Sequence, residues 1–205
     1  MRLLARADEE LLMFSALVLS TVVIFVAELG DKSQLMAMTF ATRYRARDVL
    51  IGITAATALV HLASVGIGYL IGTSFERYQG PIAVAAGLAF LAFALWTLRG
   101  DELTEDEAQK AKKATGSALL AVGLAFFLAE LGDKTMLATI TLAVREDWFG
   151  TWIGSTIGMV AADALAIGVG ALLGRKLPER VITLGAAAAF AIFGLVLIAE
   201  GLGWF

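Results

Sequence analysis

The sequence contains no cysteine, and its 205 residues include only 2 prolines and 1 histidine. Without cysteine there is no disulfide scaffold, no cysteine metal site and no thiol redox chemistry. Charged residues make up 17% of the chain, below the ~25% usual for soluble domains. The net charge of −3 excludes a nucleic-acid-binding protein built on a basic patch, and the apolar content excludes a disordered chain.

The abundant residues are apolar, at 59% of the chain, and they occur in long runs. Because a helix needs about 20 apolar residues to cross a bilayer, each such run predicts a membrane span. Helices that are apolar on every side cannot face water, which argues against a soluble helical bundle. We therefore predict an all-α integral membrane protein with six transmembrane helices, over residues 16–41, 49–72, 80–98, 118–142, 150–173 and 181–199.

The N-terminal segment, MRLLARADEELL, is a poor match to a signal peptide. Asp8, Glu9 and Glu10 interrupt its apolar run, and no A-x-A-type cleavage site precedes the first polar cluster. We interpret the segment as an interfacial lead-in to the first span.

Lysine and arginine in the loops predict the orientation, because they gather on the cytoplasmic side of a membrane protein. Arg2, Arg6, Arg77 and Arg145 lie on one side of the predicted membrane. The opposite side is expected to face the cytoplasm, which places both termini outside it and the protein in the cell inner (plasma) membrane. That side carries Arg43, Arg45, Arg47, Arg99, Lys110, Lys112, Lys113, Arg175, Lys176 and Arg180.

An internal repeat appears when the chain is shifted by 102 residues. The segment AELGDK at 27–32 then falls on an identical segment at 129–134, and His61 falls on Asp163. The spacings Gly68-xxx-Gly72 and Gly170-xxx-Gly174 also coincide, and small residues at this spacing predict close helix packing.

The repeat predicts the domain organisation of the chain. Residues 1–98 form the first three-helix repeat, 99–116 a cytoplasmic linker and 117–205 the second repeat. Because three is odd, the second repeat enters the membrane from the opposite side, which makes the two repeats inverted. Inverted repeats are common in secondary transporters, whose sites lie near mid-membrane at the repeat interface.

Each repeat carries one polar cluster at the middle of a span, where a charge costs roughly 2.5–3.5 kcal/mol on insertion scales. One reading is structural, since Glu28 and Lys32, like Glu130 and Lys134, are favourable i,i+4 ion pairs on a helix. Such pairing leaves Asp31 and Asp133 over, and it does not explain why the cost occurs twice at matching positions. We favour a functional site.

The clusters supply the ligands of a hard divalent cation. On a continuous helix, Glu28 and Asp31 share one face, as do Glu130 and Asp133, so the four carboxylates can converge where the two repeats meet. With two lysines their charge is −2, the complement of one Ca²⁺, Mg²⁺ or Mn²⁺ ion. Gly30 and Gly132 allow either close helix approach or a local helix break. Further oxygens are available from Ser33, Gln34 and Thr135, and thioethers from Met36 and Met136.

Protons compete with a cation for these oxygens, because four close carboxylates cannot all stay ionised without one. This competition is a physical basis for exchange of cations against protons. Asp163 is expensive to bury and we favour a supporting role for it, whereas His61 fits a titrating group and a structural residue equally well.

The doubled E-L-G-D-K-[ST] resembles the signature E-x-G-D-[KR]-[ST] of a membrane family over nearly the whole chain. That family includes Golgi calcium/manganese–proton transporters, thylakoid-envelope manganese transporters and bacterial MneA-type manganese exporters. The resemblance implies six spans and a non-enzymatic exchanger of Mn²⁺ or Ca²⁺ for protons, without a cofactor. It implies a cation site of Glu28, Asp31, Glu130 and Asp133, with Lys32, Ser33, Lys134 and Thr135 completing the two motifs.

Three other functions remain open from the residues. Paired acids also suit an intramembrane aspartyl protease, although a lysine follows each aspartate and the second half repeats the first. A cation channel differs from an exchanger in lacking proton-coupled flux. An exporter of small organic ions is the third alternative, and the −2 charge of the clusters favours a metal instead. The expected partners are the lipid bilayer, divalent cations and protons.

Overall fold

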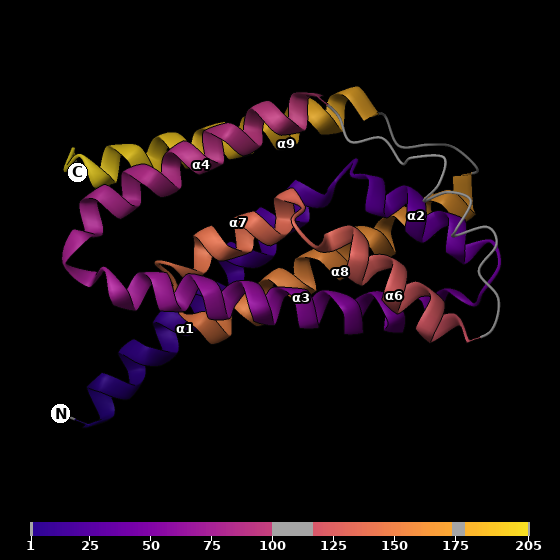
Figure 1. Ribbon diagram of the computed structural model, residues 1–205, viewed down its shortest axis with the longest axis horizontal. Coiled ribbons are helices and arrows are strands. Elements are labelled where there is room, and N and C mark those ends of the chain that lie inside the picture. Colours follow the sequence, from indigo (N-terminus) through magenta and orange to yellow (C-terminus); the bar gives the residue numbers. More distant parts are fainter. Residues whose placement is uncertain (1, 100–116, 174–178, 205) are drawn as a thin grey trace.

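The computed structural model describes residues 2–99, 117–173 and 179–204, and every regular element in these ranges is helical (Figure 1). Most of the predicted 99–116 linker and the predicted small-residue position Gly174 lie outside the described residues. The α-helices, in chain order, are α1 (Arg2–Glu28), α2 (Lys32–Ala41), α3 (Ala46–Ser74), α4 (Gln79–Arg99), α6 (Ala118–Glu130), α7 (Lys134–Ala143), α8 (Trp148–Leu173) and α9 (Glu179–Gly201), with a 3₁₀ turn at Glu76–Tyr78.

Five of the described helices are long and apolar enough to cross a membrane. The candidate spans are Glu9–Glu28, Ala46–Ser74, Gln79–Arg99, Trp148–Gly170 and Thr183–Gly201, and α6 is a shorter apolar helix. The predicted runs at 49–72, 80–98, 150–173 and 181–199 thus coincide with α3, α4, α8 and α9. The predicted N-terminal lead-in is continuous with α1, and the first candidate span begins within it.

The distribution of side chains is that of a membrane protein. Large apolar side chains cover the outside, for example Leu120 and Leu128, each 66% exposed. Charged side chains such as Glu28 and Asp163 are wholly buried. A water-soluble protein reverses this arrangement, so the all-α fold is that of an integral, multi-pass membrane protein.

The two predicted spans with polar clusters are not continuous helices. The first breaks between α1 and α2 and the second between α6 and α7, so Glu28 and Glu130 end one helix while Lys32 and Lys134 begin the next. The expectation that Glu28 and Asp31 share a helical face, three residues apart, is therefore wrong. Of the two roles open for Gly30 and Gly132, the structure has the local break.

The two halves of the chain exchange packing partners. α1 packs on α8 and α6 packs on α3, and α2 contacts α8 while α7 contacts α3. α4 and α9 lie side by side at one edge of the molecule (Figure 1). Phe90 and Phe93 of α4 meet Phe190 and Phe193 of α9, with 4.7 Å between the ring centroids of Phe90 and Phe193. This exchange brings the two helix breaks into the core between the halves.

Candidate cation site

Each helix break is built around one glycine with a left-handed backbone. Gly30 has φ 78° and Gly132 has φ 80°, and L side chains are strained in this region. The amide of Gly30 donates to Gln34 Oε1 at 2.9 Å, and the amide of Gly132 donates to Met136 Sδ at 3.2 Å. The side chain four residues on therefore supports the break in both halves.

The glutamate before each break is bound by the hydroxyl after it. Ser33 Oγ donates to Glu28 Oε1, and Thr135 Oγ1 donates to Glu130 Oε2 at 2.8 Å. Both glutamates are buried, at 0% and 1% exposure. These hydroxyls hold equivalent carboxylates at equivalent breaks, so the two halves form the same local structure. Within the described part of the chain, Glu28 Oε2 has no hydrogen-bond donor.

The aspartate after each break begins the next helix. Asp31 is the N-cap of α2 and accepts a hydrogen bond from the amide of Ser33 at 3.1 Å. Asp133 holds the same N-cap position on α7 with a similar extended backbone. A carboxylate at this position also faces the positive end of the helix dipole, which stabilises its charge.

An ion pair joins the two halves at this point. Lys134 Nζ of the second cluster pairs with Asp31 Oδ1 of the first, and both side chains are buried. This pair crosses between the two halves, unlike the i,i+4 pair of Glu130 and Lys134 that the sequence suggested. The equivalent lysine, Lys32, is only partly buried, at the first position of α2.

The buried carboxylates lie within electrostatic range of one another across the two halves. Glu28 interacts with Asp31, Glu130 and Asp163, and Glu130 interacts with Asp133, Asp31 and Asp163. As the side chains stand, no three Asp, Glu or His residues among those described form a group able to hold a metal ion. The acids are thus neighbours without the tight convergence that the sequence predicted for them.

Asp163 joins the site from the middle of α8. It is wholly buried, and neither carboxylate oxygen has a hydrogen-bond partner within the described residues. Gln34 Nε2 donates to the carbonyl oxygen of Ala162, next to Asp163, at 3.0 Å. Gln34 thus ties the break in the first half to the helix that carries Asp163.

His61 occupies the equivalent position on α3 and is also wholly buried. Among the described residues neither ring nitrogen has a hydrogen-bond partner, so no hydrogen bond joins His61 to the acids. Four residues away, Thr57 Oγ1 donates to Met159 Sδ at 3.2 Å. Because Thr57 and Met159 are equivalent under the 102-residue shift, α3 and α8 meet at matching positions.

Three features of the site escaped the sequence analysis. These are the ion pair of Asp31 and Lys134 between the two halves, the hydrogen bond from Gln34 to the carbonyl of Ala162, and the hydrogen bond from the amide of Gly132 to the Met136 sulfur. The 102-residue shift marks Gln34 and Met136 as equivalent, which is a signal for their shared role at the break.

The available donor atoms suit a hard cation. Carboxylate oxygens of Glu28, Asp31, Glu130 and Asp133 lie at the breaks, with the Ser33 and Thr135 hydroxyls beside them. Hard divalent cations prefer carboxylate, hydroxyl and carbonyl oxygens. The Met136 sulfur already accepts a hydrogen bond, which argues against its being a ligand in this conformation.

Comparison with known proteins identifies the family of the chain. Residues 16–105 and 118–204 match the family described as divalent cation/proton antiporter GDT1. A Vibrio cholerae protein named "Putative manganese exporter" is 32% identical over 185 residues, which covers 88% of this chain and 89% of that protein. A GDT1-like protein of Synechocystis is 30% identical over 199 residues, which covers 90% of this chain and 97% of that protein.

A chloroplastic GDT1-like protein of Oryza sativa is 34% identical, and the match covers 84% of this chain and 57% of that protein. No solved structure matches the chain. Such a family carries out cation transport and is not a class of enzymes, which removes the protease alternative. By its sequence match over both halves, the chain belongs to the GDT1 family of divalent cation/proton antiporters.

Proposed function

We propose that this protein exchanges a divalent cation for protons and exports Mn²⁺ from the cytoplasm, with Ca²⁺ as the alternative cation. The observation that carries the proposal is the pair of helix breaks, each with a buried glutamate and an N-capping aspartate, joined by the ion pair of Asp31 and Lys134. Buried charge at mid-membrane is expensive, and it is typical of ion and proton pathways.

The proposed architecture is six spans in two inverted repeats, with each broken helix pair, α1–α2 and α6–α7, counted as one span. Helix directions support it. Along α1 and α8 the contacts advance together, because Gly150 meets Met13 and Gly158 meets Thr21. Along α4 and α9 they run in opposite directions, because Gly80 meets Gly201 and Gly87 meets Gly194. Six alternating crossings require the first pair to be parallel and the second antiparallel.

Exchange follows from competition for one set of oxygens. The four carboxylates with Lys32 and Lys134 sum to −2 when all are ionised, which one divalent cation or two protons neutralises. Both loaded forms are neutral overall and cross at low cost, whereas the empty site carries two uncompensated charges at a cost of several kcal/mol. The empty carrier is thereby kept from crossing, and each half-cycle carries either the cation or protons.

Asp163 is proposed to support this site from α8, because its buried, unbonded oxygens interact with Glu28, Asp31 and Glu130. Lys32, Ser33, Gln34, Lys134 and Thr135 hold the carboxylates or the breaks in place. For His61 we propose only a secondary role in α3.

Mn²⁺ is proposed as the cation because one relative is named as a manganese exporter. The oxygen ligands alone suit Mn²⁺ and Ca²⁺ equally.

The proposed orientation follows from the excess of lysine and arginine in the loops on one side. With that side in the cytoplasm, both termini lie outside the cytoplasm, the 99–116 linker lies inside it, and the protein lies in the inner (plasma) membrane. The domain division at 1–98, 99–116 and 117–205 follows from the repeat.

Neutralising one site acid tests the proposal. Glu28→Gln and Glu130→Gln are expected to lower metal export at least ~10-fold, the effect of a loss of about 1.4 kcal/mol, because each removes one of the charges that the cation balances. The measurement is Mn²⁺ accumulation in cells that depend on this protein, with membrane insertion checked by immunoblot. Glu10→Gln, a change at an exposed acid of α1, is the matched control and is expected to export normally. Normal export by both site variants would reject the proposal.

A further inference from the structure

The two halves pack differently at positions that the repeat makes equivalent. On α3, a Cβ atom at Gly68 would lie 2.4 Å from the carbonyl oxygen of Ile140, and one at Gly72 would lie 2.3 Å from that of Val144. Both neighbours are backbone atoms of the α7 segment and its end, so no room remains for a methyl group. The end of α7 is therefore closed against α3.

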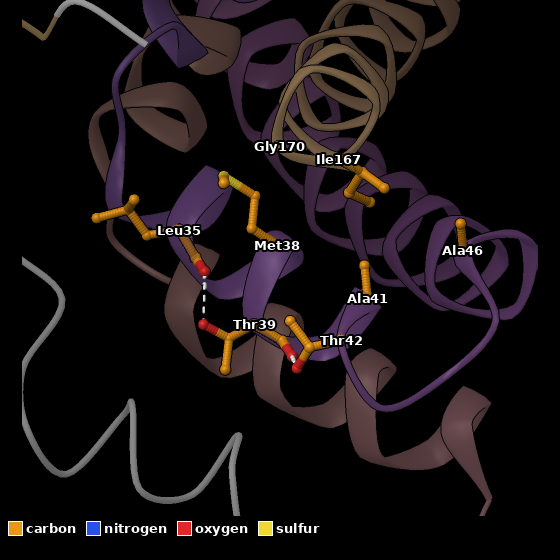
Figure 2. Close-up of a pocket in the computed structure, with 8 residues that line it drawn as sticks. All are labelled: Leu35, Met38, Thr39, Ala41, Thr42, Ala46, Ile167 and Gly170. Atoms are coloured by element: carbon orange, nitrogen blue, oxygen red, sulfur yellow. Dashed lines mark hydrogen bonds between the residues drawn. The ribbon is translucent and has the colours of Figure 1, made fainter. Parts of the chain in front are cut away.

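The equivalent contact between α2 and α8 is open. Gly170 corresponds to Gly68, and the three atoms nearest to a Cβ there all belong to the flexible side chain of Met38, the closest being Cε at 2.7 Å. A pocket of about 660 Å³ lies between the two helices beside their contact, lined by Leu35, Met38 and Thr39 of α2 and by Ile167 and Gly170 of α8 (Figure 2). Met38 reaches across this space toward Gly170, whereas the α2 backbone does not.

Burial reflects the same difference between the halves. Ala143, near the end of α7, is 3% exposed, and its equivalent at the end of α2, Ala41, is only half-buried and lines the pocket. The chemistry of the two alanines is identical, so the contrast comes from how each short helix sits on its partner.

We propose that α2 and α7 are the two gates of the transport cycle, with the α7 gate closed and the α2 gate open in this structure. The inference rests on the proposed function and orientation, in which α2 runs from the site toward the cytoplasm. The pocket between α2 and α8 is then the cytoplasmic access route to the carboxylates, and α7 on Gly68 and Gly72 seals the opposite side. The second state has α2 seated on Gly170 and α7 lifted from α3.

The covalent structure suits this motion. Each gate is a ten-residue helix attached to its neighbour through a break with a left-handed glycine, Gly30 or Gly132. Such a break transmits little bending stiffness, because no continuous helical hydrogen bonding crosses it. Closure of α2 requires Met38 to leave the space in front of Gly170, which its three rotatable bonds allow.

Thiol labelling measures the gates directly, because the chain has no cysteine and any introduced thiol is unique. Ala41→Cys is expected to react with a charged methanethiosulfonate reagent at least ~10-fold faster than its matched partner Ala143→Cys, because buried thiols are inert. In inside-out vesicles, where the cytoplasmic face is outermost, a reagent added outside the vesicles should label Ala41→Cys at the fast rate. Equal rates at the two positions would overturn the assignment of open and closed gates.

Adding a methyl group at the closed gate should reverse the pattern. Gly72→Ala places a Cβ against the Val144 carbonyl, so α7 cannot close and the labelling rate of Ala143→Cys should rise while that of Ala41→Cys falls. Gly66→Ala is the matched control on the same helix, because a Cβ there meets nothing within 4 Å. Identical labelling in the Gly72→Ala and Gly66→Ala backgrounds would contradict the proposal.

A disulfide across the open gate gives a test that does not depend on a glycine substitution. In the Met38→Cys, Gly170→Cys double variant, oxidation should form a bond only when α2 closes, stop metal transport, and be reversed by a reductant. Full transport by the oxidised, cross-linked protein would exclude α2 as a gate. The labelling pattern should persist in Glu28→Gln, whose metal export is expected to be at least ~10-fold lower, so failure of the gates and failure of the proposed function give different results.

Discussion

At the scale of single residues, the site combines acids that are bonded with acids that are not. Glu28 and Glu130 each accept a hydrogen bond from one hydroxyl. Asp31 accepts a hydrogen bond from a backbone amide and forms an ion pair with Lys134. Asp163 has no hydrogen-bond partner in the described part of the chain. A buried carboxylate without partners is strongly disfavoured when ionised, unless a cation or a proton is near. Asp163 therefore has the chemistry of a group that responds to the bound ion.

Substitutions of Asp163 and of its equivalent, His61, compare the contributions of the two residues to transport. Asp163→Asn should lower Mn²⁺ transport on the order of 10-fold or more, since about 1.4 kcal/mol of lost binding is tenfold. His61→Gln should have a smaller effect, because no hydrogen bond in the described residues links His61 to the acids. Asp163, by contrast, interacts with Glu28 and Glu130. Initial rates in proteoliposomes give the comparison. Unchanged transport by Asp163→Asn alongside a loss in His61→Gln would reverse the assignment.

At the scale of elements, the breaks decide how the site is assembled. A continuous helix would place Glu28 and Lys32 on one face and leave the two halves unconnected by charge. The break instead turns Asp31 into the N-cap of α2, where Lys134 of the other half reaches it. The local change of backbone direction at one glycine thus determines which charges pair.

Gly132→Ala isolates the backbone contribution of a break. A Cβ at Gly132 meets nothing within 4 Å, so the cost comes only from the left-handed conformation and should be about 1–2 kcal/mol. Thermal unfolding in detergent should show a lower midpoint, and transport should fall because Glu130 and Asp133 shift. Gly66→Ala, in a helical conformation with free space, is the control and should not lower the midpoint, because alanine is the better helix former. A neutral Gly132→Ala would show that the break does not need its left-handed residue.

The sequence predicted much of the fold and the candidate residues of the site. It did not predict the helix breaks or the ion pair between the two halves. Apolar runs located α3, α4, α8 and α9, and the 102-residue shift marked the acids of both clusters. The break at Gly30 was not decidable, because glycine is also common inside transmembrane helices that pack closely. The pair of Asp31 and Lys134 depends on tertiary contact, whereas the sequence offered a favourable neighbour in Glu130.

At the scale of the whole molecule, the exchanged packing of the halves allows one site to face two sides. α1 with α8 and α3 with α6 form matching pairs, and α4 with α9 joins the halves along one edge (Figure 1). Because equivalent helices run in opposite directions across the membrane in the proposed topology, a rearrangement in one half has a counterpart on the opposite side.

The proposed topology predicts the location of two points on the chain. Reporter fusions after residue 110 should report the cytoplasm, and fusions at Phe205 should report the outside, because the loops carry ten basic residues on one side and four on the other. Alkaline phosphatase and green fluorescent protein fusions provide opposite signals for each site. A cytoplasmic Phe205 would contradict the orientation if residue 110 is then outside, and would contradict three spans in the second repeat if residue 110 is also cytoplasmic.

The most direct measurement of the central claim is metal movement driven by a pH gradient alone. The wild-type protein is reconstituted in liposomes with a metal-sensitive fluorophore, with Mn²⁺ and Ca²⁺ in separate runs. If cation and protons share the buried carboxylates, an opposing pH gradient should drive Mn²⁺ uphill, and a membrane potential alone should have little effect because both loaded forms are neutral. Uphill movement driven by potential at equal pH would contradict shared-site exchange and favour an ion channel.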